Sequence, residues 1–74
     1  MHRRRAVWQL RQVLAVLRNE ARFGRETKAL ADRAEEVVEH TAVAIEPEPD
    51  EPLLELLRYA RREIAEFRER ATKD

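Results

Sequence analysis

Apolar residues recur every three or four positions along most of the chain, which is the spacing of an amphipathic helix. Two features break this pattern: the single glycine, Gly24, and a segment at 46–52 that holds all three prolines. Three segments result, at about 3–22, 26–45 and 52–72, and each suits a helix of about 30 Å. No stretch alternates apolar and polar residues as a half-buried strand does. The pattern therefore predicts an all-α fold.

Short connections between helices of matched length are typical of antiparallel neighbours. We therefore expect one domain over residues 1–74, built as an antiparallel three-helix up-down-up unit. The predicted core seam consists of the apolar residues that share one face of each helix. These are Val7, Leu10, Leu14 and Leu17 on the first helix, Leu30, Val37, Val38 and Ile45 on the second, and Leu53, Leu57, Ile64 and Phe67 on the third.

Candidate boundary residues flank each predicted helix. Gly24 can adopt the left-handed conformation that ends a helix, although a glycine inside one long helix costs only about 1 kcal/mol and leaves a kinked helix as the alternative. Asp50 suits the N-cap of the third helix, and Pro52 suits its first turn. The second helix shows no clear capping residue near its expected start at 26.

Several large apolar residues fall outside the core seam: Trp8, Val16 and Phe23 on the first helix, and Leu54, Leu56 and Tyr59 on the third. Scattered exposed apolar residues are normal, which is one explanation. The other is a second face that packs against another copy of the chain. A chain of 74 residues with no cysteine lacks disulfides to supplement its small core, and this favours packing into a homo-oligomeric bundle.

The formal net charge is zero, but the charges are segregated along the chain. Residues 1–25 hold seven arginines and one acid, whereas residues 26–45 hold two basic and five acidic side chains. We expect the arginines that repeat every seven residues on the first helix to pair with acids of the second. These arginines are Arg4, Arg11, Arg18 and Arg25, and the acids are Asp32, Glu35, Glu36 and Glu39.

The alternative role for the basic first helix is nucleic-acid binding. Arginines would contact phosphates while Trp8 stacks on a base. The candidate contacts are Arg3, Arg4, Arg5, Arg11 and Arg18. The acidic middle of the chain would repel a polyanion, which disfavours this partner.

The sequence contains no recognisable catalytic or metal-binding motif. Serine and cysteine are absent, and one glycine is too few for a glycine-rich phosphate loop. Glu36 and His40 are four residues apart, but the Glu-x-x-His spacing of di-iron bundles would need a glutamate at Val37. We therefore expect no enzyme activity, cofactor, metal or small-molecule substrate.

No apolar run approaches the roughly 18–20 residues of a transmembrane helix, and no signal-peptide core follows the basic start. We therefore expect no membrane association, and a cytoplasmic location for a natural protein of this sequence.

In the second half of the chain, the residue at each position suits the linker or helix that is expected there. The linker reads Glu46-Pro47-Glu48-Pro49-Asp50-Glu51-Pro52 and leads directly into a regular helical pattern over 53–63. In this, in its matched helices and in its lack of serine and cysteine, the chain resembles de novo designed helical proteins made as symmetric homo-oligomers. Its thirteen arginines against two lysines depart from that style. The resemblance implies a self-assembling structural module, and it leaves the oligomer number and symmetry open.

Overall fold

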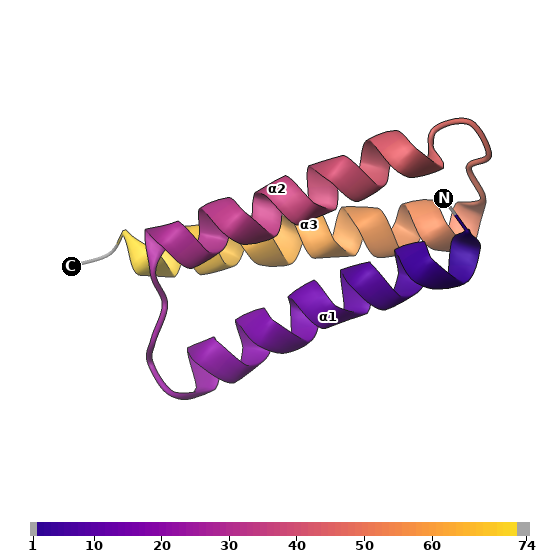
Figure 1. Cartoon of the computed structure of the whole chain (residues 1–74). Coiled ribbons are helices and arrows are strands. Elements are labelled where there is room, and N and C mark those ends of the chain that lie inside the picture. Colours follow the sequence, from indigo (N-terminus) through magenta and orange to yellow (C-terminus); the bar gives the residue numbers. More distant parts are fainter. Residues whose placement is uncertain (1, 73–74) are drawn as a thin grey trace.

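The computed structural model describes residues 2–72 and contains three helices: α1 (Arg3–Arg22), α2 (Lys28–Ile45) and α3 (Glu51–Ala71). α2 runs antiparallel to α1 and α3, and each helix packs against both others (Figure 1). The bundle is 41 Å long and 17 by 16 Å across. The predicted all-α, up-down-up unit is thus confirmed, and each helix end lies within two residues of its expected position.

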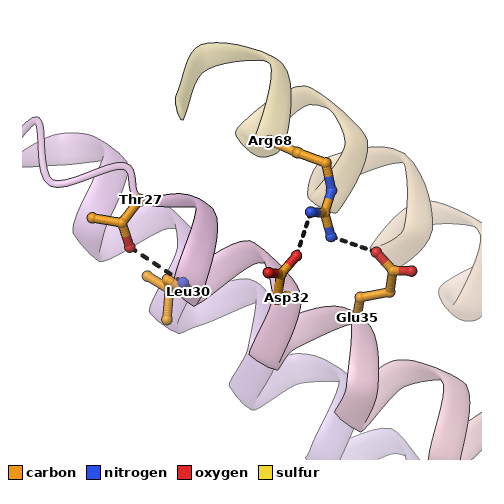
Figure 2. A network of polar contacts seen from close by, with 5 residues as sticks. All are labelled: Thr27, Leu30, Asp32, Glu35 and Arg68. Atoms are coloured by element: carbon orange, nitrogen blue, oxygen red, sulfur yellow. Dashed lines mark hydrogen bonds and ion pairs between the residues drawn. The ribbon is translucent and has the colours of Figure 1, made fainter. Parts of the chain in front are cut away.

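Each helix begins after a residue whose side chain accepts a hydrogen bond from a backbone N–H of the first turn: His2, Thr27 and Asp50. Asp50 accepts from the Leu53 N–H at 2.9 Å, as the sequence predicts. Thr27 accepts from the Leu30 N–H at 3.2 Å (Figure 2). The second helix therefore has a cap after all, and this cap moves its start from the expected residue 26 to Lys28.

The turn after α1 is set by Gly24, which has a φ of 68°. Its N–H donates to the Ala21 carbonyl at 3.1 Å, and the Arg25 N–H donates to the Glu20 carbonyl at 2.9 Å. This pair of bonds is the Schellman motif, in which a left-handed residue satisfies the last carbonyls of a helix. Gly24 is therefore a turn between two helices and not a kink within one.

The core runs along the whole bundle and includes most of the predicted seam. Nine predicted seam residues are buried: Leu10, Leu14, Leu17, Val38, Ile45, Leu53, Leu57, Ile64 and Phe67. Val7 and Leu30 lie half-buried against them. The prediction that Val37 belongs to the core seam is wrong, because its side chain is 41% exposed. Val38 takes the core position, and adjacent residues on a helix point about 100° apart, so Val37 faces the flank of α2.

One polar contact links α1 and α2 within the core. Ala6, Ala31 and Ala34 are also buried. Thr41 is the one buried polar residue within 2–72. Its hydroxyl oxygen lies 2.9 Å from both the Gln9 Oε1 atom and the Val37 carbonyl oxygen, so its single hydrogen is shared between these two acceptors. The contact with Gln9 links α2 to α1 near the middle of α1.

Candidate functional site

An open apolar groove of about 360 Å³ lies between α1 and α2. Its floor is made by core residues, including Val13, Leu17 and Ala34. The large side chains at its edges are exposed: Trp8 by 61%, Val16 by 44% and Val37 by 41%. Leu30, Gln9, Gln12 and Arg33 complete the lining. We call this surface the α1/α2 groove.

The hollow follows from residue size at one position of α2. Ala34 lies one turn from Leu30 and one turn from Val37, so all three share a side of the helix. The small methyl group of Ala34 leaves a gap between the two larger neighbours. Opposite it, α1 presents Val13 and Val16, and neither valine is long enough to fill the gap. The groove therefore stays open to solvent while its walls remain apolar.

Polar chemistry is sparse in the groove. The Gln9 amide oxygen is already engaged by Thr41 across the two helices. Arg33 is the one ionisable side chain of the lining. A single charged group at the rim provides neither an acid–base pair nor a nucleophile with its base. The lining of the groove is therefore mainly apolar.

The structure divides the six candidate interface residues into three groups. Trp8 and Val16 line the α1/α2 groove. Phe23 does not line the groove and is 59% exposed. The centre of its ring lies 4.8 Å from the Arg25 guanidinium carbon. The three residues of α3 instead lie half-buried against the core of their own chain: Leu54, Leu56 and Tyr59. The large apolar side chains that remain exposed therefore lie on α1, on α2 and at the end of α1, and not on α3.

Sequence reasoning missed the α2 wall of the α1/α2 groove. The sequence places Val37 and Leu30 in the core seam because they continue its three-to-four spacing. The adjacent pair Val37–Val38 carries a partial signal, since neighbouring helix positions point about 100° apart and one of them can face the flank of the core. Val43, which is 69% exposed on α2, was also overlooked, and it lies outside the groove lining.

The acids of α2 bind arginines of α3, which corrects the predicted pairing with α1. Arg68 donates to both Asp32 and Glu35 (Figure 2). Arg61 donates to Glu39 through two nitrogens, each at 2.8 Å. Every helix of a three-helix bundle has two neighbours, so acids on α2 can reach either one. The spacing of these acids places them on the side that faces α3.

This pairing leaves most of the basic side chains of α1 without an acidic partner. Two arginines of this region do form ion pairs: Arg3 with Asp50 at 3.0 Å, and Arg25 with Glu20 at 2.7 Å. Within residues 2–72, no ion pair forms at Arg4, Arg5, Arg11, Arg18 or Arg22. Arg18 donates to the Tyr59 hydroxyl of α3 instead.

Two carboxyl groups have shifted pKa values. The hydrogen bond from Arg61 lowers the pKa of Glu39 below the ordinary glutamate value. The hydrogen bond from Arg25 likewise lowers the pKa of Glu20. Both shifts come from exposed ion pairs, which stabilise a protein only slightly. Both pKa shifts are therefore explained by ion pairs on the surface of the bundle.

A second open hollow, of about 490 Å³, lies over α2 and α3, and its rim charges include the paired Glu39, Arg61 and Arg68. No group of three or more potential ligands could hold a metal ion among residues 2–72. None of the helices in that range combines the length and the apolar character needed to cross a bilayer.

Comparison with protein-family models, curated proteins and solved structures finds no match for this chain.

Proposed function

We propose that this protein is a non-enzymatic, self-associating structural module, and that its α1/α2 groove binds a second copy of the chain. The observation that carries the proposal is the exposure of Trp8, Val16 and Val37 around one apolar groove. Continuous apolar patches with a polar rim are typical of protein–protein contact sites. A homo-oligomer would give these side chains the burial that the isolated bundle does not provide.

The exposed area of the bundle supports the same proposal. The chain exposes 5417 Å², whereas a monomer of this mass typically exposes about 4,800 Å². Its elongated shape, 41 Å by 17 Å by 16 Å, accounts for part of the excess. An interface of standard size would bury roughly 800 Å² of each chain, which is more than this difference of about 600 Å².

Sedimentation equilibrium of the intact chain over a range of concentrations tests the proposal directly. We expect a mass that is a multiple of 8.8 kDa and that decreases on dilution. Two valines of α2 give a matched pair of variants. Val37→Ser removes an apolar side chain from the groove, and Val43→Ser makes the same change on an exposed site outside it.

Comparison of the two variants distinguishes the loss of a groove contact from the general effect of a polar substitution on the surface. Val37→Ser should raise the concentration at which the oligomer dissociates, while Val43→Ser should leave it close to that of the wild type. A monomeric mass at every concentration would contradict the proposal. Equal effects of the two variants would show that another surface mediates association.

Nucleic-acid binding is the second candidate function, and the unpaired arginines of α1 favour it. Of its five candidate contacts, Arg3 is occupied by Asp50 and Arg18 by Tyr59, which leaves Arg4, Arg5 and Arg11. Fluorescence anisotropy with a labelled single-stranded oligonucleotide tests it. Binding that weakens as salt rises and that is reduced by Arg11→Gln would support this function. Absence of binding at low salt would eliminate it.

A further inference from the structure

One long face of the bundle is comparable in size with a standard protein interface. The bundle is 41 Å long and 17 by 16 Å across, so such a face covers about 700 Å². A standard interface buries roughly 800 Å² of each partner. A second copy that crossed the groove at a steep angle would cover less than half of the face. A contact of standard size therefore requires the helices of both copies to run along the whole groove, either parallel or antiparallel.

The groove carries both a projecting side chain and a hollow, at different levels along the bundle. Gln9 of α1 contacts Thr41 of α2. Seven residues later on α1 comes Val16, and seven residues earlier on the antiparallel α2 comes Ala34, so these two lie opposite each other in the lining. The hollow over Ala34 is at this level. Trp8, the largest apolar side chain of the lining, lies eight residues before Val16 and therefore about 12 Å away along α1.

Two symmetric dimers align the helices along the groove, and they place Trp8 differently. A two-fold axis parallel to the helices keeps each residue at its own level, so Trp8 of each copy stays about 12 Å from the hollow of the other. An axis across the helices reverses the second copy. Where this axis crosses α1 near Gln12, halfway between Trp8 and Val16, it brings each Trp8 to the level of the other copy's hollow. Gln12 is also close to the midpoint of α1 (Arg3–Arg22), so the two faces still overlap over their full length.

The charged side chains do not oppose this reversed arrangement. Among the described residues, no arginine of α1 lines the groove. Arg18 lies on the side of α1 that faces α3, where it donates to the Tyr59 hydroxyl, and Arg11 lies two turns earlier on the same side. The one charged residue of the lining is Arg33, next to Ala34 on α2. An indole that fills the hollow over Ala34 comes close to this guanidinium, and arginine is attracted to the face of a tryptophan ring.

Given the self-association proposed above, we infer that the second copy docks in the reverse direction, about a two-fold axis across the helices, with α1 over α1 and α2 over α2. Trp8 of each copy inserts into the hollow over Ala34 of the other, beside Arg33. A large aromatic side chain in a pocket is a common anchor of protein–protein contacts. The hollow and the side chain that fills it belong to one patch, as a two-fold contact requires.

A distance between two spin labels tests the direction of docking, because the unmodified chain has no cysteine. Glu48→Cys places one nitroxide label in the exposed turn at one end of the bundle, outside the groove lining. We expect pulsed electron paramagnetic resonance to give a separation of about 40 Å, because reversed copies hold the labels at opposite ends of a bundle 41 Å long. Packed helices lie about 8–10 Å apart, so labels at the same end would be only about 20 Å apart. A distribution centred near that shorter distance would overturn the inference.

Substitution of Ala34 gives a second test, in which the two arrangements differ in sign. Ala34→Leu fills the hollow with a side chain of the same copy, which blocks Trp8 of the other, so the dissociation constant should rise roughly tenfold or more. A hollow that stays vacant in the interface would instead be filled by the leucine and strengthen the contact. An unchanged or lower dissociation constant would therefore contradict the inference.

Ala29→Leu is the matched control for this substitution. It makes the same change at an exposed site of α2 outside the groove, and it should leave the dissociation constant within about threefold of the wild-type value. Circular dichroism of both variants verifies that the bundle is intact.

Failure of the reversed docking and failure of the proposed function give different results. A mass of 8.8 kDa at every concentration would refute self-association itself. A labelled chain that associates but shows the short separation would refute only the reversed docking.

Discussion

Trp8 offers the most direct test of the groove, because it is the only tryptophan of the chain and its side chain is 61% exposed. The perturbation is Trp8→Ala. Alanine preserves the helix, since it has the highest helix propensity. The change therefore removes the largest apolar side chain of the groove and leaves the backbone of α1 intact.

The expected magnitude follows from the exposed area. A tryptophan side chain can bury up to about 250 Å², so the 61% that is exposed corresponds to about 150 Å². At roughly 25 cal/mol per Å², covering it contributes about 3–4 kcal/mol per chain. A symmetric dimer buries two such side chains, or about 7 kcal/mol as an upper limit. Each 1.4 kcal/mol is tenfold in affinity, so Trp8→Ala should weaken dimerisation by several orders of magnitude.

Two measurements follow this change. Sedimentation equilibrium gives the dissociation constants of the wild type and of Trp8→Ala. The emission of Trp8 in the wild type should also shift to shorter wavelengths as concentration rises, because the indole moves from water into an apolar contact. Phe23→Ala is the matched control, since Phe23 is a similarly exposed aromatic that does not line the groove.

The reasoning would be refuted by either of two results. One is a dissociation constant for Trp8→Ala within tenfold of the wild-type value in a chain that does associate. The other is a Trp8 emission maximum that stays constant while the mass increases. Both would place the interface away from the α1/α2 groove.

Three further predictions concern stability. Gly24→Ala should lower the free energy of unfolding by about 1 kcal/mol, because the site has a φ of +68° although no atom lies within 4 Å of an added Cβ. Thermal melting should show a decrease of roughly 4–8 °C, and an unchanged melting temperature would contradict this. Thr41→Val removes the hydroxyl bond to Gln9, but Gln9 is only half-buried and can bind water. Urea unfolding should therefore change by less than about 1 kcal/mol, and a loss above about 3 kcal/mol would show that this contact is essential. The pKa of Glu39 is lowered by its bond from Arg61, so the pair stabilises the fold above the ordinary glutamate value of about 4.3 and loses this effect as pH falls through the lower folded value. Melting temperatures should therefore fall less below pH 5 for Glu39→Gln than for the wild type, and identical pH profiles would refute this assignment.

The sequence is a good predictor of the helices because their signals are local. Gly24 and Asp50 each act within one turn of the residue that carries the signal, through a positive φ and a side-chain cap. α2 begins two residues later than the apolar spacing predicts, because Thr27 caps it. Threonine is a regular N-cap residue, so this information was present in the sequence.

Pairing between helices was predicted less well because it depends on rotation about each helix axis. The sign of the charges identified arginine–acid pairs but could not say which neighbour supplies the arginine. The deciding geometry is the match between Arg61 and Arg68, two turns apart on α3, and the acids from Asp32 to Glu39 on α2. Val37 illustrates the same limit, since a rotation of about 100° separates the core from the flank of a helix.

Within residues 2–72, α1 carries both arginines without an acidic partner and apolar side chains exposed to water. α2 and α3 neutralise each other across their shared side, and the additional apolar side chains of α3 rest on the core. α1 keeps a row of unpaired arginines and contributes the Trp8 and Val16 wall of the groove. A polyanion would neutralise the arginines but leave the apolar wall in water. A purely apolar helix would cover the wall but leave the arginines unpaired. The Leu30 and Val37 flank of α2 is apolar, whereas the acids Asp32, Glu35 and Glu39 on the same helix already bind arginines of α3. The proposed self-association through the groove would therefore cover the apolar wall of α1 and would not require its arginines to find acidic partners.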